Sequence, residues 1–205
     1  MSSLLLRGFV LGFAVAATPG PIFLLCLRRT LAHGWLHGLV SGLGVATADG
    51  FYAAVAVFGV TAVTSLLTGE RKLLAIAGGA MLVVLGVRIV LEKPRSSGVA
   101  ATNGNHVAWA YGSTLGLTIA NPATILSFAA LAATLGTGTG GGYLGPALVV
   151  TGVLLGSVTW WLVLATAAAW LRARITPRVI RGVGTVSGIA IAALGLVATV
   201  SAFAA

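Results

Sequence analysis

Asp49 is the acidic residue whose position best suits chemistry. It lies near the middle of a long apolar run, 37–63, whereas Glu70 and Glu92, the other two acidic residues, sit at the ends of such runs. A carboxylate at the centre of a membrane costs about 2.5–3.5 kcal/mol on insertion scales, so one kept there usually has a function. Asp49 is therefore a candidate for proton coupling or for binding a substrate ammonium group, with a hydrogen-bonded structural role as the alternative.

Proline interrupts two of the apolar runs. The first interruption comprises Thr18, Pro19, Gly20 and Pro21, and the second comprises Asn121 and Pro122. Proline removes a backbone donor and clashes with the preceding turn, so each helix is predicted to break there. Backbone groups freed inside a membrane must face protein or a water-filled cavity. We therefore place all six residues in a candidate substrate-binding site, with two structural kinks as the alternative.

Other polar groups occur within the same runs. They are Thr47, Tyr52, Thr118, Thr124 and Ser127. Together with Thr18 and Asn121 they could bind a substrate carboxylate or ammonium group, but we favour bonds to their own helix backbones for any single Thr or Ser. Ser127 is retained as a site candidate. Trp160 and Trp161 lie well inside a run, where either lining a cavity or packing would suit them.

Two basic clusters favour structural interpretations. Arg28 and Arg29 are read as determinants of membrane orientation, with a gating role as the alternative. His33 and His37 have a spacing that can chelate a metal ion, but no third ligand is near in the sequence. We predict no metal and no cofactor.

The composition identifies the elements that must hold these residues. Of the 205 residues 58% are hydrophobic and 7% charged, against about 25% charged in soluble domains. This excludes an ordinary soluble enzyme, a disordered chain and, despite a net charge of +9, a typical nucleic-acid binder. One cysteine excludes a disulfide framework. Motifs for hydrolases, metalloproteases and nucleotide binding are also missing, so we predict a membrane protein that is not an enzyme.

Six runs are long enough to span a membrane as helices. They cover 4–27, 37–63, 73–91, 108–133, 144–171 and 178–203. With six spans both termini lie on one side, together with three basic residues, while nine basic residues lie on the other side. The positive-inside rule then predicts termini outside and loops one, three and five in the cytoplasm.

Glycine spacing suggests an internal repeat. Gly8 and Gly12 match Gly112 and Gly116, Gly38 and Gly42 match Gly152 and Gly156, and Gly79 and Gly86 match Gly188 and Gly195. Two tandem three-helix units have opposite orientations, which is the inverted-repeat design of secondary transporters. We predict one transmembrane domain, 1–205, made of repeat one (1–92), a flexible cytoplasmic linker (93–107) and repeat two (108–205), with the first helix of each repeat broken.

The order of four segments resembles the LysE/RhtB superfamily of amino-acid exporters along the whole chain. The segments are GFAVAATPGPIFLL, GLVSGLGVATADGFYAAVAVFG, GLTIANPATILSF and GSVTWWLVLATAAAWL. The resemblance implies a bacterial inner-membrane protein that exports amino acids, driven by the proton gradient or the membrane potential. It also implies inverted repeats, a role in the site for both breaks and for Asp49, and a homodimer.

One departure bears on the substrate. Relatives that export lysine or arginine tend to carry a further acid soon after Asn-Pro, where this chain reads ATILSF. A neutral amino acid or a related small metabolite therefore fits the site at least as well as a cationic amino acid. The expected partners are this small-molecule substrate and the lipid bilayer, and no nucleic acid. A channel or inorganic-cation exporter is the first alternative function, and a non-transporting membrane assembly partner is the second.

Overall fold

The computed structural model describes residues 2–58, 71–91, 104–121, 124–125, 127–128, 143–174 and 176–204. All regular secondary structure in these ranges is helical, which confirms the predicted all-α class. The helices are α1 (Ser2–Ala16), α2 (Pro21–His33), α3 (Trp35–Phe58), α5 (Arg71–Leu91), α6 (Gly104–Ile119), α8 (Leu144–Arg172) and α9 (Pro177–Ala204).

Three of these helices are long and apolar enough to cross a membrane. They are α3, α8 and the part of α9 from Arg178 to Ser201. The bent pair of α1 and α2 makes a fourth span if the two helices are counted as one. The predicted run 108–133 lies partly outside the described residues, as do the end of 37–63 and most of the linker. The predicted bounds of the fifth and sixth runs agree with α8 and α9 within a few residues.

Two predicted boundaries are wrong. The first run does not stop at Leu27, because α2 continues through Arg28 and Arg29 to His33. It ends at Gly34, whose φ of 97° lies in the left-handed region that glycine adopts without strain. The linker prediction is also too long, because residues 104–107 form the first turn of α6.

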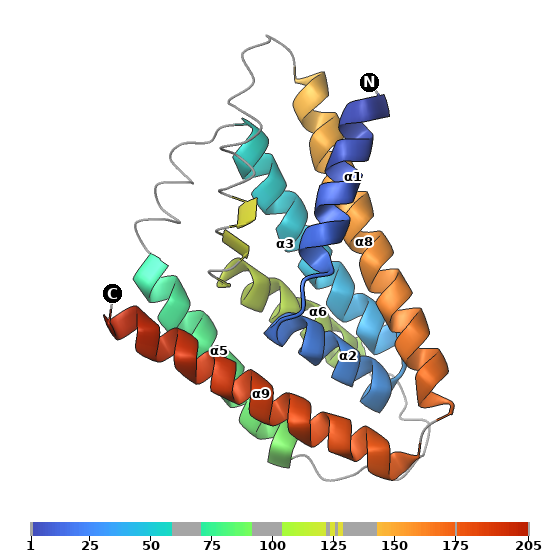
Figure 1. Cartoon of the computed structure of the whole chain (residues 1–205), viewed down its shortest axis with the longest axis vertical. Coiled ribbons are helices and arrows are strands. Elements are labelled where there is room, and N and C mark those ends of the chain that lie inside the picture. The colour runs from blue at the N-terminus through green and yellow to red at the C-terminus, as the bar shows by residue number, and fades with distance from the viewer. Residues whose placement is uncertain are drawn as a thin grey trace.

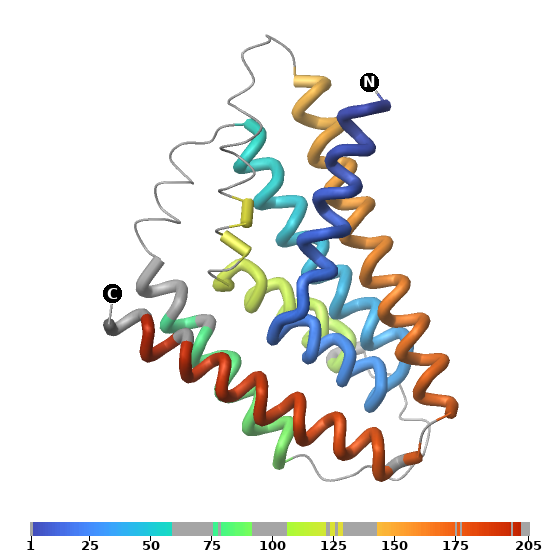
Figure 2. The backbone as a smooth tube through the Cα atoms, in the orientation of Figure 1, coloured from blue at the N-terminus to red at the C-terminus, as the bar shows by residue number. Residues whose placement is uncertain are grey.

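Helices from the two predicted halves pack directly on one another. In Figure 1, α1 runs alongside α8, and α5 runs alongside α9 at the opposite edge. The tube in Figure 2 shows α2 and α6 between these two pairs, and α3 contacts both α6 and α8. The break between α1 and α2 and the end of α6 therefore belong to elements that contact the other half.

Glycine permits the closest of these contacts. A Cβ at Gly12 would lie 2.2 Å from the Val153 carbonyl oxygen, and one at Gly156 would lie 2.1 Å from the Phe9 carbonyl oxygen. Such distances leave no room for a side chain, so α1 and α8 meet backbone to backbone. Gly79 and Gly195 meet in the same way between α5 and α9, each facing the other's carbonyl oxygen.

Candidate functional site

The first predicted break is present between α1 and α2. Their axes differ by 79° across the residues between Ala16 and Pro21. The Thr18 backbone N–H donates to Val15 O at 3.2 Å, and the Thr18 hydroxyl donates to Ala14 O at 3.1 Å. The Thr18 side chain thus occupies a carbonyl that continued helix would have used, which stabilises the broken end.

The start of α2 is open on one side. Thr18 and Pro19 are exposed, and Gly20 is extended, with φ −166° and ψ −173°. Among the described residues, nothing lies within 4 Å of a Cβ built on Gly20, and no side chain there caps the first turn of α2 with a hydrogen bond. The free N–H groups of a helix start suit a negatively charged ligand.

At the second interruption, α6 ends where the Asn-Pro pair predicts. Its last helical residue is Ile119, and the Asn121 N–H donates to Thr118 O at 3.2 Å. The Tyr52 hydroxyl of α3 donates to the Ile119 carbonyl, which would otherwise lose its helical partner. Helical residues recur at 124, where the Ile125 N–H donates to Asn121 O at 3.1 Å. Pro122 lies outside the described residues, and Ser127 is exposed.

Asp49 is buried and forms a hydrogen bond between the two predicted halves. Its side chain is 2% exposed, and its Oδ2 accepts a 2.7 Å hydrogen bond from the Ser157 hydroxyl of α8. Within the described ranges it is the sole carboxylate, and it forms no ion pair there. Ser157 is a partner that sequence reasoning missed, although it directly follows Gly156 in a matched glycine pair.

Two apolar clusters place Asp49 between the broken helices. The first cluster joins residues from both sides of the first break to α3 and α8: Ala16, Ile22, Cys26, Val45, Ala46 and Trp161. The second joins α3 and α8 to the segment after Asn121: Tyr52, Ala53, Ile125, Phe128 and Val153. Val45 and Ala46 lie one turn before Asp49 and Tyr52 and Ala53 one turn after it, so both breaks pack on α3 on either side of the carboxylate.

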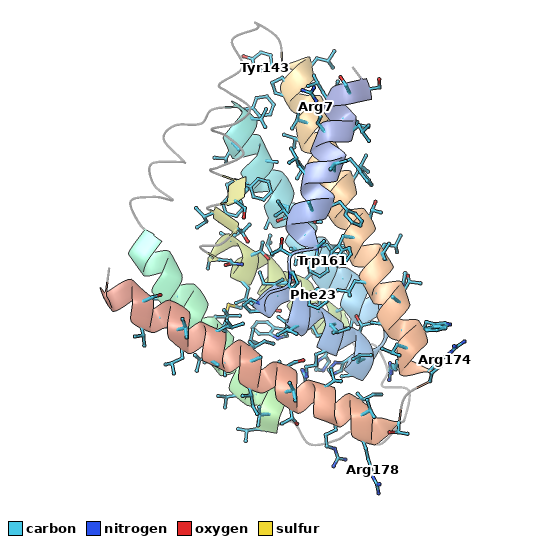
Figure 3. The ribbon with its side chains drawn as sticks, in the orientation of Figure 1. Arg7, Phe23, Tyr143, Trp161, Arg174 and Arg178 are labelled. Atoms are coloured by element: carbon cyan, nitrogen blue, oxygen red, sulfur yellow. The ribbon has the colours of Figure 1, made fainter. Side chains whose placement is uncertain are left out.

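The tryptophan pair of α8 lies beside the first break. Trp161, labelled in Figure 3, packs in one apolar cluster with Ile22, the second residue of α2. The Trp160 ring contacts Phe13 edge-on, with centroids 5.3 Å apart, and lies over Phe23 at 6.5 Å. Both indole nitrogens, Nε1 of Trp160 and Nε1 of Trp161, are buried without a hydrogen-bond partner in the described part of the chain. Each is thus a buried donor left unsatisfied, which is uncommon in a native structure.

Most other hydroxyl groups serve their own helices, as favoured from the sequence. Thr47 donates to Leu43 O at 2.9 Å, and Thr118 donates to Thr114 O at 2.7 Å. Thr47 also accepts a 2.9 Å bond from the Tyr111 hydroxyl, so α3 and α6 share polar contacts along their length. The rings of His33 and His37 lie 5.5 Å apart, and the described residues hold no group of three side chains able to ligate a metal.

Arg29 is the largest departure from the sequence interpretation. It lies within α2 and not in a loop, and its side chain is only 7% exposed. Its guanidinium donates hydrogen bonds to a serine of α3 and to a serine and a backbone carbonyl of α6. The signal that could have located it is the presence of Ser41 and Ser113 within apolar runs, where each supplies an acceptor.

Comparisons with known proteins identify the family. A family described as "LysE type translocator" matches residues 13–202. "Putative amino acid efflux protein YcgF" of Bacillus subtilis is 23% identical over 198 residues, which cover 94% of this chain and 93% of that protein. "Chemotactic transduction protein ChpE" of Pseudomonas aeruginosa is 30% identical over 177 residues, covering 84% and 85%. No solved structure matches. Because the family match extends over almost the whole chain, this protein belongs to the LysE type translocators, a family of membrane transporters.

Proposed function

We propose that this translocator exports amino acids, or closely related small metabolites, across the bacterial inner membrane. The observation that carries the proposal is Asp49, a buried carboxylate held by Ser157 between two interrupted helices. A group of this kind binds a proton or an ammonium, and interrupted helices supply backbone donors for a carboxylate. The name of the relative YcgF agrees with this class of substrate.

In the proposed site the two charged groups of an amino acid have different partners. Asp49 binds the ammonium group or the coupling proton. The N–H groups at the start of α2, with the indole N–H groups of Trp160 and Trp161, bind the carboxylate. We assign Thr18, Pro19, Gly20 and Pro21 at the first break, and Asn121, Pro122 and Ser127 at the second, to substrate binding. A site with one carboxylate suits a neutral amino acid.

We propose six spans arranged as inverted repeats. The glycine contacts support this arrangement, because the predicted alignment matches Gly79 with Gly188 and Gly86 with Gly195. Exchanging the halves therefore turns the contact of Gly79 with Gly195 into that of Gly188 with Gly86, and both contacts occur. Gly112 and Gly116 depart from the symmetry, since a Cβ on either meets no described residue within 4 Å.

Alternating access and proton-gradient or membrane-potential coupling are part of the same proposal. The close backbone packing of α1 with α8 and of α5 with α9 opposes a movement of one whole half against the other. Hinging of α2 about residues 17–20 changes exposure of the site and leaves both of these helix pairs packed. We place the arginine-rich end in the cytoplasm; Figure 3 shows Arg174 and Arg178 at one end of the molecule and Arg7 at the other. A homodimer is proposed from the family resemblance.

Efflux after dipeptide loading tests the function. Cells that hydrolyse imported dipeptides accumulate the free amino acids, and expression of this protein should lower the intracellular pool of at least one of them. Asp49→Asn should abolish this efflux at unchanged membrane abundance. Ser157→Ala, which keeps the carboxylate and removes its donor, is the matched variant and should retain part of the activity. Full efflux by Asp49→Asn would remove Asp49 from the mechanism.

The second candidate function is a non-transporting membrane component. The name of ChpE, a chemotactic transduction protein, is the observation that favours it. Reconstituted vesicles separate the two functions, because a signalling component releases no preloaded amino acid. Amino-acid-independent current or metal efflux from the same vesicles would instead support a channel or an inorganic-cation exporter.

A further inference from the structure

Arg29 lies at the meeting point of three helices. It sits one turn before the end of α2, and its Nη1 donates to Ser41 Oγ of α3 at 3.0 Å and to Ala110 O of α6 at 2.9 Å. Its Nη2 donates to Ser113 Oγ of α6 at 2.8 Å. We call this group, Arg29 with Ser41, Ala110 and Ser113, the arginine latch. It joins two helices of the first predicted half to one of the second.

The acceptors of the latch are all neutral. The Ser41 hydroxyl donates a hydrogen bond to His37 O at 2.8 Å, and the Ser113 hydroxyl donates one to Trp109 O at 2.6 Å. Each serine therefore offers the guanidinium only a lone pair. Asp49, the single carboxylate in the described ranges, lies eight residues beyond Ser41 on α3, about 12 Å along the helix, and bonds Ser157 instead.

The Arg29 guanidinium would be stabilised by an anionic partner. A buried guanidinium that faces uncharged oxygens has lost its hydration without gaining a counter-charge, which is costly. Carboxylates accept shorter and stronger charge-assisted bonds, often from two nitrogens of the same arginine. A carboxylate that reaches Arg29 therefore competes well with two serine oxygens and one carbonyl.

The latch is placed where such competition would change access. Thr114 reinforces it by donating to Ser41 O at 2.7 Å, so α3 and α6 are held together at this level. The turn at Gly34 that follows α2 lies against Arg172 at the end of α8, since a Cβ there would be 2.9 Å from Arg172 Nη1. The latch thus closes the bundle near its arginine-rich end, some distance from Asp49.

We propose that Arg29 receives the carboxylate of the incoming substrate and that this exchange releases α2 from α3 and α6. The inference rests on the proposed function, since it assigns the carboxylate two successive partners. Arg29 binds it on entry, and the start of α2 binds it at the level of Asp49. The same guanidinium disfavours cationic substrates that lack a free carboxylate.

Alkylation of Cys26 can report the separation of α2 from α3 and α6. Cys26, the single cysteine of the sequence, is 1% exposed and lies three residues before Arg29 on α2. Its rate of alkylation by N-ethylmaleimide in purified protein measures how often α2 separates from its neighbours. We expect the double variant Ser41→Ala with Ser113→Ala, and separately Arg29→Gln, to raise this rate at least several-fold.

Three controls define what the labelling means. Arg88→Gln removes an exposed arginine of α5 and should label at the wild-type rate. Arg29→Lys keeps the charge but cannot place two nitrogens between α3 and α6, so it should label fast, whereas a role in orientation alone predicts wild-type labelling. Ser113→Ala alone is the mildest variant, and we expect it to elute as a single species during size exclusion. Faster labelling of a variant that elutes in this way reports opening and not unfolding. Wild-type rates in all latch variants would overturn the latch.

Three small molecules test whether Arg29 recognises a carboxylate. Acetate carries only the carboxylate, glycinamide only the ammonium, and glycine both. At equal ionic strength acetate and glycine should accelerate alkylation of wild-type Cys26 at least twofold, glycinamide should not, and Arg29→Gln should respond to none. An equal response to acetate and glycinamide, or no response to acetate, would overturn carboxylate recognition by Arg29.

The proposed function can fail separately from this inference. Asp49→Asn leaves the latch intact, so it should keep the acetate response while losing efflux. An acetate response in a wild-type protein that releases no amino acid from vesicles would contradict the proposed export and leave the anion site standing.

Discussion

Gly12 and Gly116 hold matching places in the predicted repeat, yet their surroundings predict opposite effects of alanine. A Cβ at Gly12 would lie 2.2 Å from Val153 O and 2.6 Å from Val153 Cα, whereas contacts under 3.0 Å essentially never occur. α1 would therefore have to move away from α8 by about 0.8 Å. A Cβ at Gly116 meets nothing within 4 Å among the described residues.

The magnitude follows from the length of the contact. Gly8, Gly152 and Gly156 lie in the same backbone-to-backbone seam, so a shift at Gly12 loosens the whole of it. A gap of about 0.5–1 Å forfeits a quarter to a half of the dispersion energy. Overpacking costs about 1–3 kcal/mol, and the better helix propensity of alanine returns about 0.5–1 kcal/mol. With the middle of each range, about 2 less about 0.75 kcal/mol, Gly12→Ala should lose about 1 kcal/mol net, while Gly116→Ala should gain about 0.5–1 kcal/mol.

Thermal unfolding of the purified protein in detergent, followed by tryptophan fluorescence, measures both variants. For a chain of this size 1 kcal/mol corresponds to about 2–4 °C, so Gly12→Ala should lower the midpoint by about 2–4 °C. Gly116→Ala should raise it by about 1–4 °C. Equal losses in the two variants, or an unchanged midpoint for Gly12→Ala, would refute the assignment of the α1–α8 seam.

Three further predictions concern the breaks and the second seam. Gly20→Leu should abolish efflux at an unchanged unfolding midpoint, because the space beside Gly20 is open; a variant that transports normally would show that substrate does not pass there. Tyr52→Phe should lower the midpoint, since loss of the bond to the Ile119 carbonyl costs about 1 kcal/mol, and a midpoint equal to wild type would contradict this. Gly86→Val should destabilise the α5–α9 pair and lower the midpoint, because its Cβ would lie 2.6 Å from Gly188 O. A Cβ at Gly182 meets nothing within 4 Å among the described residues, so Gly182→Ala should raise the midpoint slightly in the same melt, and equal midpoints would argue against the contact.

Local chemistry explains which parts of this arrangement the sequence predicts. Proline at 19 and 21 lacks a backbone N–H and clashes with the preceding helical turn, so an apolar helix cannot continue through these positions. The break between α1 and α2 therefore follows from residue type alone. The end of α6 before Pro122 follows for the same reason. Glycine spacing likewise predicts close helix contacts, but not which helix is the partner, because a small residue permits approach from any neighbour.

Properties that depend on tertiary contacts could not be predicted from the sequence. Arg29 looks like a flanking charge, because its burial depends on Ser41 and Ser113, which come from other helices. The bond from Ser157 to Asp49 spans 108 residues and has no local signature. Gly112 and Gly116 look equivalent to Gly8 and Gly12, yet they lack close neighbours among the described residues, because α6 meets α3 through Gly44, Tyr111 and Thr114 instead.

The glycine seams also constrain biogenesis. The bare faces of α1 and α5 find their partners, α8 and α9, only in the last third of the chain. While the ribosome is still synthesising the C-terminal helices, the earlier ones rest in lipid with those faces uncovered. Premature termination would leave them permanently so, which makes a truncated product a natural target for membrane quality control. Two separately expressed fragments, 1–92 and 93–205, should by the same reasoning be degraded alone and persist when produced together.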